Sequence, residues 1–323
     1  MVSKVTNTIL SNMQRRVTAV DIVTSARNES ANLKLLFNRI HESLLGSHYT
    51  WRLIISDNAS SDDTWEVICE LSELSNQVSG IRLSRDFGFE GSITAALSES
   101  TADVTIIMAS DLQDAPERIP EFIHMYLSGY DHVYQIVTKR PGTSRLRSFN
   151  SKVYYSIANK FSRGLITKDS STYRLISGRM RDTLLLMPER NRYLRAMVNW
   201  IGFASIGIEF DREQRIIGLS KANSRHVIDY AVKNTLANSY YLLNFIAIFG
   251  FLSSLGAILL VVTFSFIWIT KGVPFEGYGL LVGFLSLGFS IILLFLGILS
   301  QYISLMYEEI KDRPNYIISQ KTD

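Results

Sequence analysis

Two long uncharged runs near the C-terminus constrain this chain more than any other feature. Between residues 242 and 269 the only polar residues are Asn, Ser and Thr, and residues 278–307 contain no charged side chain. Each run is longer than the roughly 20 residues that a helix needs to cross a bilayer core of about 30 Å. They account for a hydrophobic fraction of 47%, which is high for a wholly soluble protein. The sequence therefore predicts two transmembrane helices, at about 242–269 and 279–303.

The residues around these runs predict how the helix pair is oriented. The link TKGVPFEGY (270–278) is short, so we expect a hairpin with both ends on one side of the membrane. Lys221, Arg225 and Lys233 precede the first run, and the positive-inside tendency places that side in the cytoplasm. The N-terminus lacks the apolar core of a secretory signal, and a lone cysteine, Cys69, is typical of a reducing compartment. We expect a multi-pass protein of the cell inner (cytoplasmic) membrane with a cytoplasmic large domain.

The first 240 residues alternate between apolar strand-like runs and helix-like periodicity. Between Ala31 and Leu45, large apolar side chains recur at three- and four-residue spacing. Such alternation predicts an α/β fold, with a parallel sheet that helices cover on both faces. The predicted strands are 17–26, 51–57, 80–84 and 103–110. The expected divisions are an N-terminal extension (1–16), the α/β domain (17–222), a juxtamembrane amphipathic helix (223–239), the helix pair (240–307) and a cytoplasmic tail (308–323).

Polar clusters follow three of the predicted strands: SARNE (25–29), SDNASSDDT (56–64) and SDLQD (110–114). In open parallel sheets, ligands bind outside the carboxyl ends of the strands, so these clusters predict one common site. No glycine-rich dinucleotide fingerprint follows the first strand and no P-loop occurs, which disfavours Rossmann oxidoreductases and P-loop NTPases. The five histidines show no zinc-binding spacing.

Several segments, in order along the chain, resemble family-2 glycosyltransferases. The resemblance is to the membrane-bound polyprenyl-phosphate group related to dolichol-phosphate mannose synthase and bactoprenol glucosyltransferase. The matching segments span residues 20 to 318, so they cover nearly the whole chain. They are RNESANL (27–33), SDNASSDDT (56–64), LSRDFGFEGS (83–92), DLQDAPERIPEFI (111–123), MPERNRYLRAMVNWIGF (187–203), RIIGLSK (215–221) and YEEIKDRPNYII (307–318).

The resemblance implies a GT-A fold, a Rossmann-like and mostly parallel sheet that binds a nucleotide sugar. It also implies Mg²⁺ or Mn²⁺ bridging the diphosphate, because a hard cation with oxygen ligands neutralises the leaving group. Asp111 and Gln113 match the positions that hold the ion and the diphosphate. The implied nucleotide-sugar residues are Ser25, Arg27, Asn28, Glu29, Asp57, Asn58, Arg85, Ser110 and Asp111.

Four departures from the family pattern cluster where the donor is expected. Ala109 stands for the first Asp of Asp-Ala-Asp-Leu-Gln-Asp, and residues 57–59 read Asp-Asn-Ala instead of Asp-Asp-Gly. Arg27 replaces a Tyr, and Thr172 replaces the Asp before Phe-Arg-Leu. Two interpretations remain open: an altered nucleotide or sugar preference, or a loss of activity.

The implied reaction is an inverting transfer of a sugar onto a lipid phosphate. The second pKa of a phosphate monoester is near 6, so the nucleophile is mostly ionised at neutral pH and needs no strong base. Cationic side chains are needed instead, to position two anionic partners. The candidate catalytic residues are Asp111, Arg174, Arg215 and Lys221. Candidates for the acceptor phosphate are Arg140, Arg145, Arg147, Arg192 and Arg195; for the first three, solvated surface charge is the equal alternative.

Residues 188–203 mix Arg with Tyr, Trp, Met and Phe. This composition predicts a helix in the lipid headgroup layer, with a helix packed in the soluble core as the alternative. We also predict that residues 224–238 form a helix in the lipid headgroup layer. Small residues in the helix pair permit close packing, either within the hairpin or between subunits of a homo-oligomer, since relatives include tetramers. These residues are Gly250, Gly256, Gly283 and Gly288.

The resulting functional hypothesis is a membrane-bound hexosyltransferase with a UDP-sugar donor, UDP-glucose first, and polyprenyl (undecaprenyl) phosphate as acceptor. Its product would serve surface-glycan, O-antigen or lipopolysaccharide modification. The expected partners are the nucleotide sugar, the lipid and the bilayer, with no nucleic acid. Two alternatives remain: an enzyme with a lipid-linked oligosaccharide or glycerolipid acceptor, and a non-catalytic scaffold in glycan assembly.

Overall fold

The computed structural model describes residues 15–138, 167, 170–211, 241–271 and 278–322. The described chain falls into two compact units. The first contains the described residues up to 211 together with residues 313–322, and the second contains 241–271 and 278–312. The expected N-terminal extension, apart from its last two residues, and the expected juxtamembrane helix lie outside the described residues.

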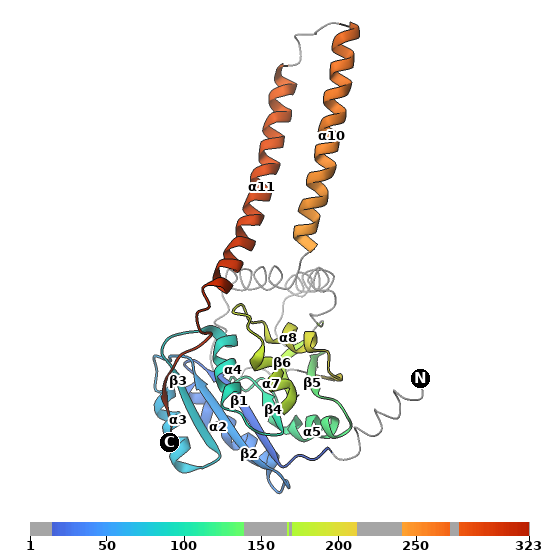
Figure 1. Ribbon diagram of the computed structural model, residues 1–323. Helices are drawn as coiled ribbons and strands as arrows, with labels where there is room; N and C mark the ends of the chain where they lie inside the picture. The colour runs from blue at the N-terminus through green and yellow to red at the C-terminus, as the bar shows by residue number, and fades with distance from the viewer. Residues whose placement is uncertain (1–14, 139–166, 168–169, 212–240, 272–277, 323) are drawn as a thin grey trace, which may run out of the picture. The chain divides into compact units, whose positions relative to one another are not determined.

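The first unit is built on one sheet of eight described strands in the order β7-β5-β6-β4-β1-β2-β3-β8 (Figure 1). Strands β3, β2, β1 and β4 run parallel, β6 is antiparallel to both β4 and β5, and β8 is antiparallel to β3. The bounds are β1 Ala19–Ala26, β2 Thr50–Asp57, β3 Val78–Leu83, β4 Val104–Ile107, β5 His132–Val137, β6 Ser170–Ser177, β7 Ser205–Phe210 and β8 Ile318–Lys321. This mostly parallel α/β sheet confirms the predicted GT-A fold class.

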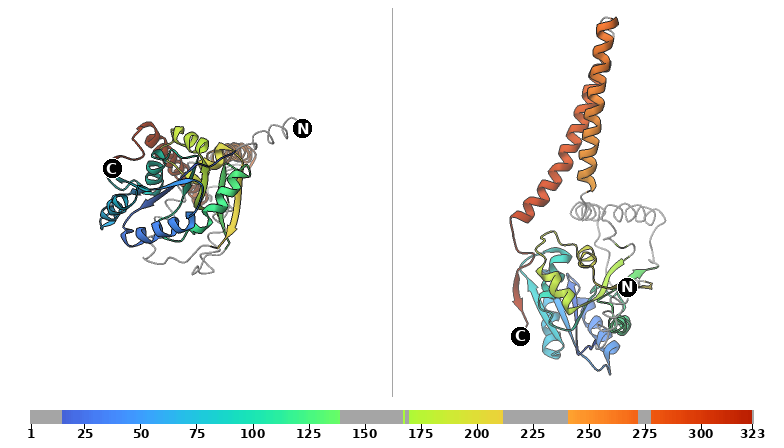
Figure 2. Two further views of the ribbon diagram at one scale, coloured as in Figure 1. Left: turned by 90° about the horizontal axis from the view of Figure 1, so that it is seen from below. Right: turned by 45° about the vertical axis from the view of Figure 1, so that its right-hand side comes forward.

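Helices cover both faces of the sheet, as the left view of Figure 2 shows. Alternate residues of each central strand point to opposite faces, so Ile22 and Val23 belong to different cores. The Ile22 face packs against α2, α3 and α5, and the Val23 face packs against α4, α7 and α8. The bounds are α2 Ser30–Leu44, α3 Thr64–Leu74, α4 Gly88–Ser98, η1 Pro116–Arg118, α5 Ile119–Leu127, α7 Gly178–Leu186 and α8 Leu194–Ile201.

Three predicted elements are longer in the sequence analysis than in the structure, and the first of them, the strand predicted over 17–26, begins at Ala19. The strand predicted over 103–110 ends at Ile107, because the chain then turns, with Leu112 in the left-handed region at a φ of 61°. The helix predicted over 188–203 is α8 alone, and residues 188–193 are not helical. Pro188 follows the end of α7, and proline at such a position cannot continue a helix.

The second unit contains two long helices, α10 (Tyr241–Lys271) and α11 (Tyr278–Ile310). The rings of Phe249 and Phe295 meet edge to face with centroids 5.5 Å apart, so the helices lie side by side at that level. Within the searched part of the chain, the segment Leu287–Ile310 is long and apolar enough to cross a membrane. The two predicted long helices are therefore present, and their passage through a bilayer remains a prediction.

Candidate active site

Three left-handed residues shape the turns that follow β1, β2 and β4. Asn28, Ala59 and Leu112 have φ angles of 55°, 54° and 61°. Non-glycine residues adopt this region rarely, and such strain is concentrated at functional sites. Ala59 stands where the family pattern has glycine, so the structure gives the physical reason for that glycine: the turn keeps its left-handed shape although a Cβ is present.

The turn after β4 presents the predicted metal residues. Leu112 is fully buried, whereas Asp111 and Gln113 on either side of it stay partly exposed, and the Gln113 N–H donates to Asp111 Oδ1 at 3.3 Å. A hydrogen bond within the turn stabilises it, because Asp114 accepts a hydrogen bond from Ala109 N at 2.8 Å. Ser110 Oγ donates to the carbonyl of Ser25 at 2.9 Å and so joins this turn to the end of β1.

The turn after β2 contains a buried carboxylate. Asp57 is fully buried, and its Oδ1 accepts a hydrogen bond from Ser60 N at 2.9 Å. Its Oδ2 lies 3.2 Å from Arg82 Nε, at ion-pair distance but without hydrogen-bond alignment. Arg82 comes from β3, so this pair ties two strand ends together beneath the predicted nucleotide site.

A residue that the sequence analysis did not select connects three strand ends. Asp86, after β3, accepts hydrogen bonds from Asn58 Nδ2 at 2.7 Å and from Gly88 N at 2.8 Å, and it forms an ion pair with Arg27. Arg27 and Asn58 are two of the departures from the family pattern, and both contact this one carboxylate. Arg85, which was selected, lies over the Phe87 ring at 4.1 Å. A carboxylate directly after a strand was the available signal for Asp86.

The turns after β1 and β2 are also joined directly. Asn28 N donates to Ser60 Oγ at 2.9 Å, and Asn28 Oδ1 accepts a hydrogen bond from Ser61 N at 2.8 Å. Glu29 N donates to Thr64 Oγ1 at 3.0 Å. Since parallel strands end at the same edge, the structure brings the predicted nucleotide-sugar residues together there, at the ends of β1 to β4.

Strand β6 carries a buried cation. Arg174 is 2% exposed, and its guanidinium donates to the carbonyls of Thr172 at 3.2 Å and Ser171 at 2.7 Å. Burial, and then the nearby charge of Arg195, lower the pKa of Arg174 to about 10. Arg195 itself donates to the carbonyl of Ser170 at 3.2 Å. The negative charge of Glu90 acts on the pKa of Arg174 in the opposite direction, so an anionic side chain already lies close to this cation.

Arg192 stabilises the C-terminal end of α7. It is buried, and its guanidinium donates to the carbonyls of Leu184 at 2.6 Å and Met187 at 3.1 Å, at the end of α7. Burial lowers the pKa of this guanidinium. Cations at a helix C-terminus satisfy its last carbonyls. Its predicted contact with an acceptor phosphate stays a prediction, and the candidates Arg140, Arg145, Arg147, Arg215 and Lys221 lie outside the described residues.

Helix α8 has one buried and one exposed face. Leu194, Met197 and Val198 pack in the second core, whereas Trp200 is 66% exposed. The inner face agrees with the core-packed alternative, and the exposed tryptophan agrees with a headgroup-layer helix. Both interpretations therefore stay open for this segment.

Among the described residues, no group of three His, Cys, Asp or Glu side chains is arranged to hold a metal ion. Mg²⁺ is usually bound through one or two carboxylates plus substrate phosphates and water, not by an all-protein cage. Asp111 and Gln113, partly exposed on one turn, offer one carboxylate and one amide oxygen. This donor set fits an ion that is shared with a nucleotide diphosphate.

The fold and the strand-end site define a GT-A glycosyltransferase, and comparison with known proteins gives the family. The glycosyl transferase family 2 domain matches residues 21–184, which is half of the chain. An uncharacterised glycosyltransferase of Synechocystis sp. is 30% identical over 93% of this chain and 94% of its own length. The chain therefore belongs to glycosyl transferase family 2.

Two further proteins are similar to this chain. A prophage-derived bactoprenol glucosyl transferase of Shigella flexneri is 29% identical over 93% of this chain and 97% of its own length. The glucosyl-3-phosphoglycerate synthase of Mycobacterium tuberculosis, solved with Mn²⁺, UDP and phosphoglyceric acid, has a TM-score of 0.48 and 15% identity. That match covers 68% of this chain and 76% of the solved one, and the metal and nucleotide belong to that protein.

Proposed function

We propose that this glycosyltransferase moves a sugar from a nucleotide sugar to a polyprenyl phosphate, with inversion at the anomeric carbon. The observation that carries the proposal is the meeting of Asp57, Asn58, Asp86 and Asp111 at one sheet edge in a family-2 chain. The acceptor is inferred from the full-length similarity to a bactoprenol glucosyl transferase. Surface-glycan or lipopolysaccharide modification is the corresponding use of the product.

The donor nucleotide is proposed to lie across the ends of β1, β2 and β3, with its diphosphate at the turn after β4. Asp86 and Arg27 are exposed by 40% and 52% in their side chains, so a nucleobase can reach them. Asp57 and Arg82 lie beneath and fix the strand ends. UDP-glucose remains the first donor to test, and the contacts of Arg27 and Asn58 with Asp86 support an altered base preference over a decayed site.

Asp111 and Gln113 are the residues proposed to hold Mg²⁺ or Mn²⁺ together with the diphosphate. When bound, such an ion neutralises charge on the departing nucleoside diphosphate. The side chains keep this position because Leu112 anchors the turn in the core and Asp114 accepts the hydrogen bond of Ala109 N. The chain thus supplies orientation, and the ligand supplies the remaining oxygens.

The acceptor side is proposed to lie at β6 and α8. The bond between the anomeric carbon and the diphosphate breaks while a phosphate oxygen of the lipid forms the new bond. No proton has to be removed from the nucleophile, because it is already mostly ionised at neutral pH. Arg174 and Arg195 place two positive charges on this side, although both also donate to main-chain carbonyls.

A membrane anchor of two helices is supported by chain connectivity. Residues before α10 and residues after α11 belong to the same sheet, since β8 pairs with β3. Both ends of the helix pair must therefore be on the same side of any membrane that it crosses, so an even number of crossings follows. With Leu287–Ile310 apolar enough to cross, we propose that α10 crosses as well and that the catalytic unit is cytoplasmic.

The proposal is tested with membranes containing the full chain, undecaprenyl phosphate, Mg²⁺ or Mn²⁺ and a panel of radiolabelled UDP-, GDP-, CDP- and dTDP-sugars. We expect label to enter a lipid extract with one nucleotide and to be lost with Asp111→Asn. Label in oligosaccharide or glycerolipid instead would select the alternative acceptors. Absence of transfer with every donor, together with absence of nucleotide binding, would favour the scaffold alternative.

A further inference from the structure

The C-terminal segment after α11 returns to the catalytic sheet as its last strand. Strand β8 pairs antiparallel with β3, with Ile81 opposite Lys321 and Leu83 opposite Ile318. In Figure 1 the C-terminus lies beside β3 and α3. Three of the four residues of β8 are exposed, so this strand is held mainly by backbone hydrogen bonds and by a few apolar side chains.

Those apolar side chains lie at the donor-site end of β3. Tyr316 and Ile318 pack against a small core cluster of Ile81, Leu83 and Ala95, together with Phe87. Beyond the ladder, Ser84 N donates to the carbonyl of Ile317 at 2.9 Å. The segment 315–318, called the tail anchor below, therefore contacts the loop 84–87 that follows β3.

The tail anchor also contacts α4 and the segment after α7. Asn315 Nδ2 donates to the carbonyl of Glu189 at 3.2 Å. A Cβ at Gly91 would lie 2.7 Å from the Asn315 carbonyl oxygen and 3.0 Å from Phe87 Cβ. Gly91 is thus a position where only the missing side chain lets the tail and the loop come this close.

The loop that the tail anchor supports contributes directly to the donor site. Phe87 N donates to Asn58 Oδ1 at 2.9 Å, and Asp86 accepts from Asn58 Nδ2 and pairs with Arg27. Among the described strands, β3 is flanked by β2 on one side and by β8 on the other, so without β8 the strand that leads into loop 84–87 would be the edge of the sheet. From these contacts we propose that the tail anchor is a positioning element of the donor site, required for Asn58 and Asp86 to hold a nucleoside diphosphate.

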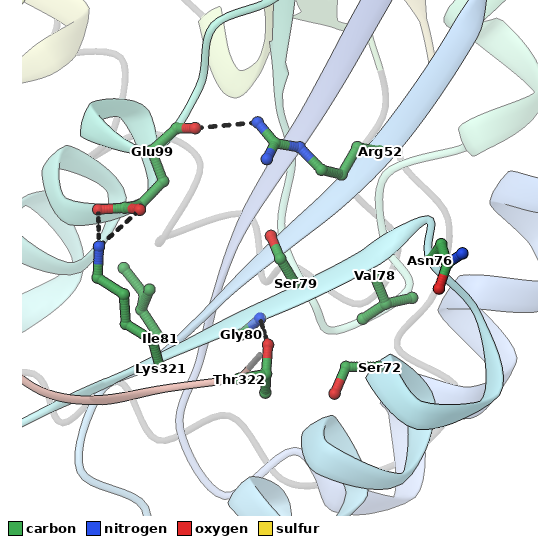
Figure 3. A pocket seen from close by; sticks show the side chains of 10 residues that line it. All are labelled: Arg52, Ser72, Asn76, Val78, Ser79, Gly80, Ile81, Glu99, Lys321 and Thr322. Carbon is green, nitrogen blue, oxygen red and sulfur yellow. Dashed lines mark hydrogen bonds and ion pairs between the residues drawn. The ribbon is translucent and has the colours of Figure 1, made fainter.

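The opposite end of β8 provides a matched control. There Lys321 Nζ lies 2.7 and 2.8 Å from the two carboxylate oxygens of Glu99, and Thr322 Oγ1 accepts from Gly80 N (Figure 3). These contacts border a hollow of about 420 Å³ at the amino end of β3, away from loop 84–87. Removing Lys321 should loosen β8 without disturbing the donor site.

The inference rests on the proposed function for its ligand, so the test needs one readout without nucleotide. In the full-length protein, Tyr316→Ala and Gly91→Ala should speed hydrogen exchange at the amides of Ser84 and Phe87. They should also weaken nucleoside diphosphate affinity about tenfold, which corresponds to about 1.4 kcal/mol. The donor KM should rise while kcat and the KM of the lipid stay within twofold. Lys321→Ala should change none of these.

Ile318→Lys in the full-length protein tests the same contact, because it places a charge in the cluster of Ile81, Leu83 and Ala95. We expect it to weaken UDP affinity about tenfold and to speed hydrogen exchange at the amides of Ser84 and Phe87, as the other two variants do. Unchanged exchange at Ser84 and Phe87 in all three variants would overturn the inference, whatever nucleotide binds. Faster exchange in the variants, together with wild-type protein that binds no nucleotide, would instead overturn the proposed donor.

Discussion

The two halves of the catalytic sheet use charged residues in opposite ways. At the ends of β1 to β4, Arg27 and Asp86 are exposed by 52% and 40%, and they contact each other across strand ends. Around β5 to β7, Arg174 is 2% exposed and donates to main-chain carbonyls. An arginine is thus exposed and ion-paired with a carboxylate in one half, and buried against main-chain carbonyls in the other.

This difference shows that neither the residue type nor the motif determines whether an arginine is exposed to solvent or buried against the main chain. A buried guanidinium that satisfies carbonyls is costly to remove, because those carbonyls then lose their partner in a dry environment. An exposed ion pair contributes about 0–1 kcal/mol, because solvent screens it. The exposed pair of Arg27 and Asp86 can therefore be substituted at low cost in stability, whereas the buried Arg174 cannot.

The largest effect is expected at the turn after β4. Asp111→Asn should lower transfer activity by about 100-fold or more, the usual loss when a preorganised electrostatic contact to developing charge is removed. It should also abolish the Mn²⁺ dependence of nucleotide binding, measured by titration calorimetry. Asp103→Asn, at the opposite edge of the sheet, serves as control. Equal Mn²⁺-dependent affinity in Asp111→Asn and wild type would show that the metal assignment is wrong.

The next effect tests the comparison itself. Arg174→Met should lower the free energy of unfolding by about 1–3 kcal/mol, because the carbonyls of Ser171 and Thr172 lose their donor. Arg27→Met should lower it by less than about 1 kcal/mol. Thermal unfolding of both purified variants decides this point. Equal destabilisation by the two substitutions would break the distinction between the halves.

A smaller effect concerns pH and the buried histidine of β5. Burial, and then the charge of Arg174, lower the pKa of His132 well below its ordinary value of 6.5. The unfolded chain takes up a proton near pH 6.5 and the folded chain does not. Stability is therefore complete above that pH and falls below it, by at most about 1.4 kcal/mol per pH unit. His132→Leu should remove this slope in unfolding measured between pH 7 and 5, whereas the exposed His124→Gln should retain it.

The smallest change in stability is expected at Asp86. Asp86→Asn removes the ion pair with Arg27, and an exposed pair of this kind contributes about 0–1 kcal/mol. The ranking of UDP, GDP, CDP and dTDP affinities should nevertheless change several-fold, because Arg27 and Asn58, two of the departures from the family pattern, contact this carboxylate. The change in melting temperature on addition of each nucleotide measures this ranking. An unchanged ranking would remove Asp86 from base recognition.

Much of the donor edge could be predicted from the sequence. Runs such as WRLIISD and VTII are apolar and end in polar clusters, and parallel strands place such clusters at one edge. The clusters that contain Asp57 and Asp111 were predicted on that basis, and the resemblance to family-2 glycosyltransferases then selected these two residues. Asp86 was passed over for its neighbour Arg85, because sequence shows that both follow a strand but not which of them faces the adjacent strand ends.

What the sequence determined by itself is the local part: alternating strands and helices, two long apolar helices, and strand-end clusters of a family-2 glycosyltransferase. These depend on periodicity and on neighbouring residues, which the chain shows directly. Only the tertiary structure decided that Arg174 and Arg192 are buried against carbonyls and that residues 318–321 complete the sheet beside β3. Burial and strand pairing arise from residues far apart in the chain, and only folding brings them into contact.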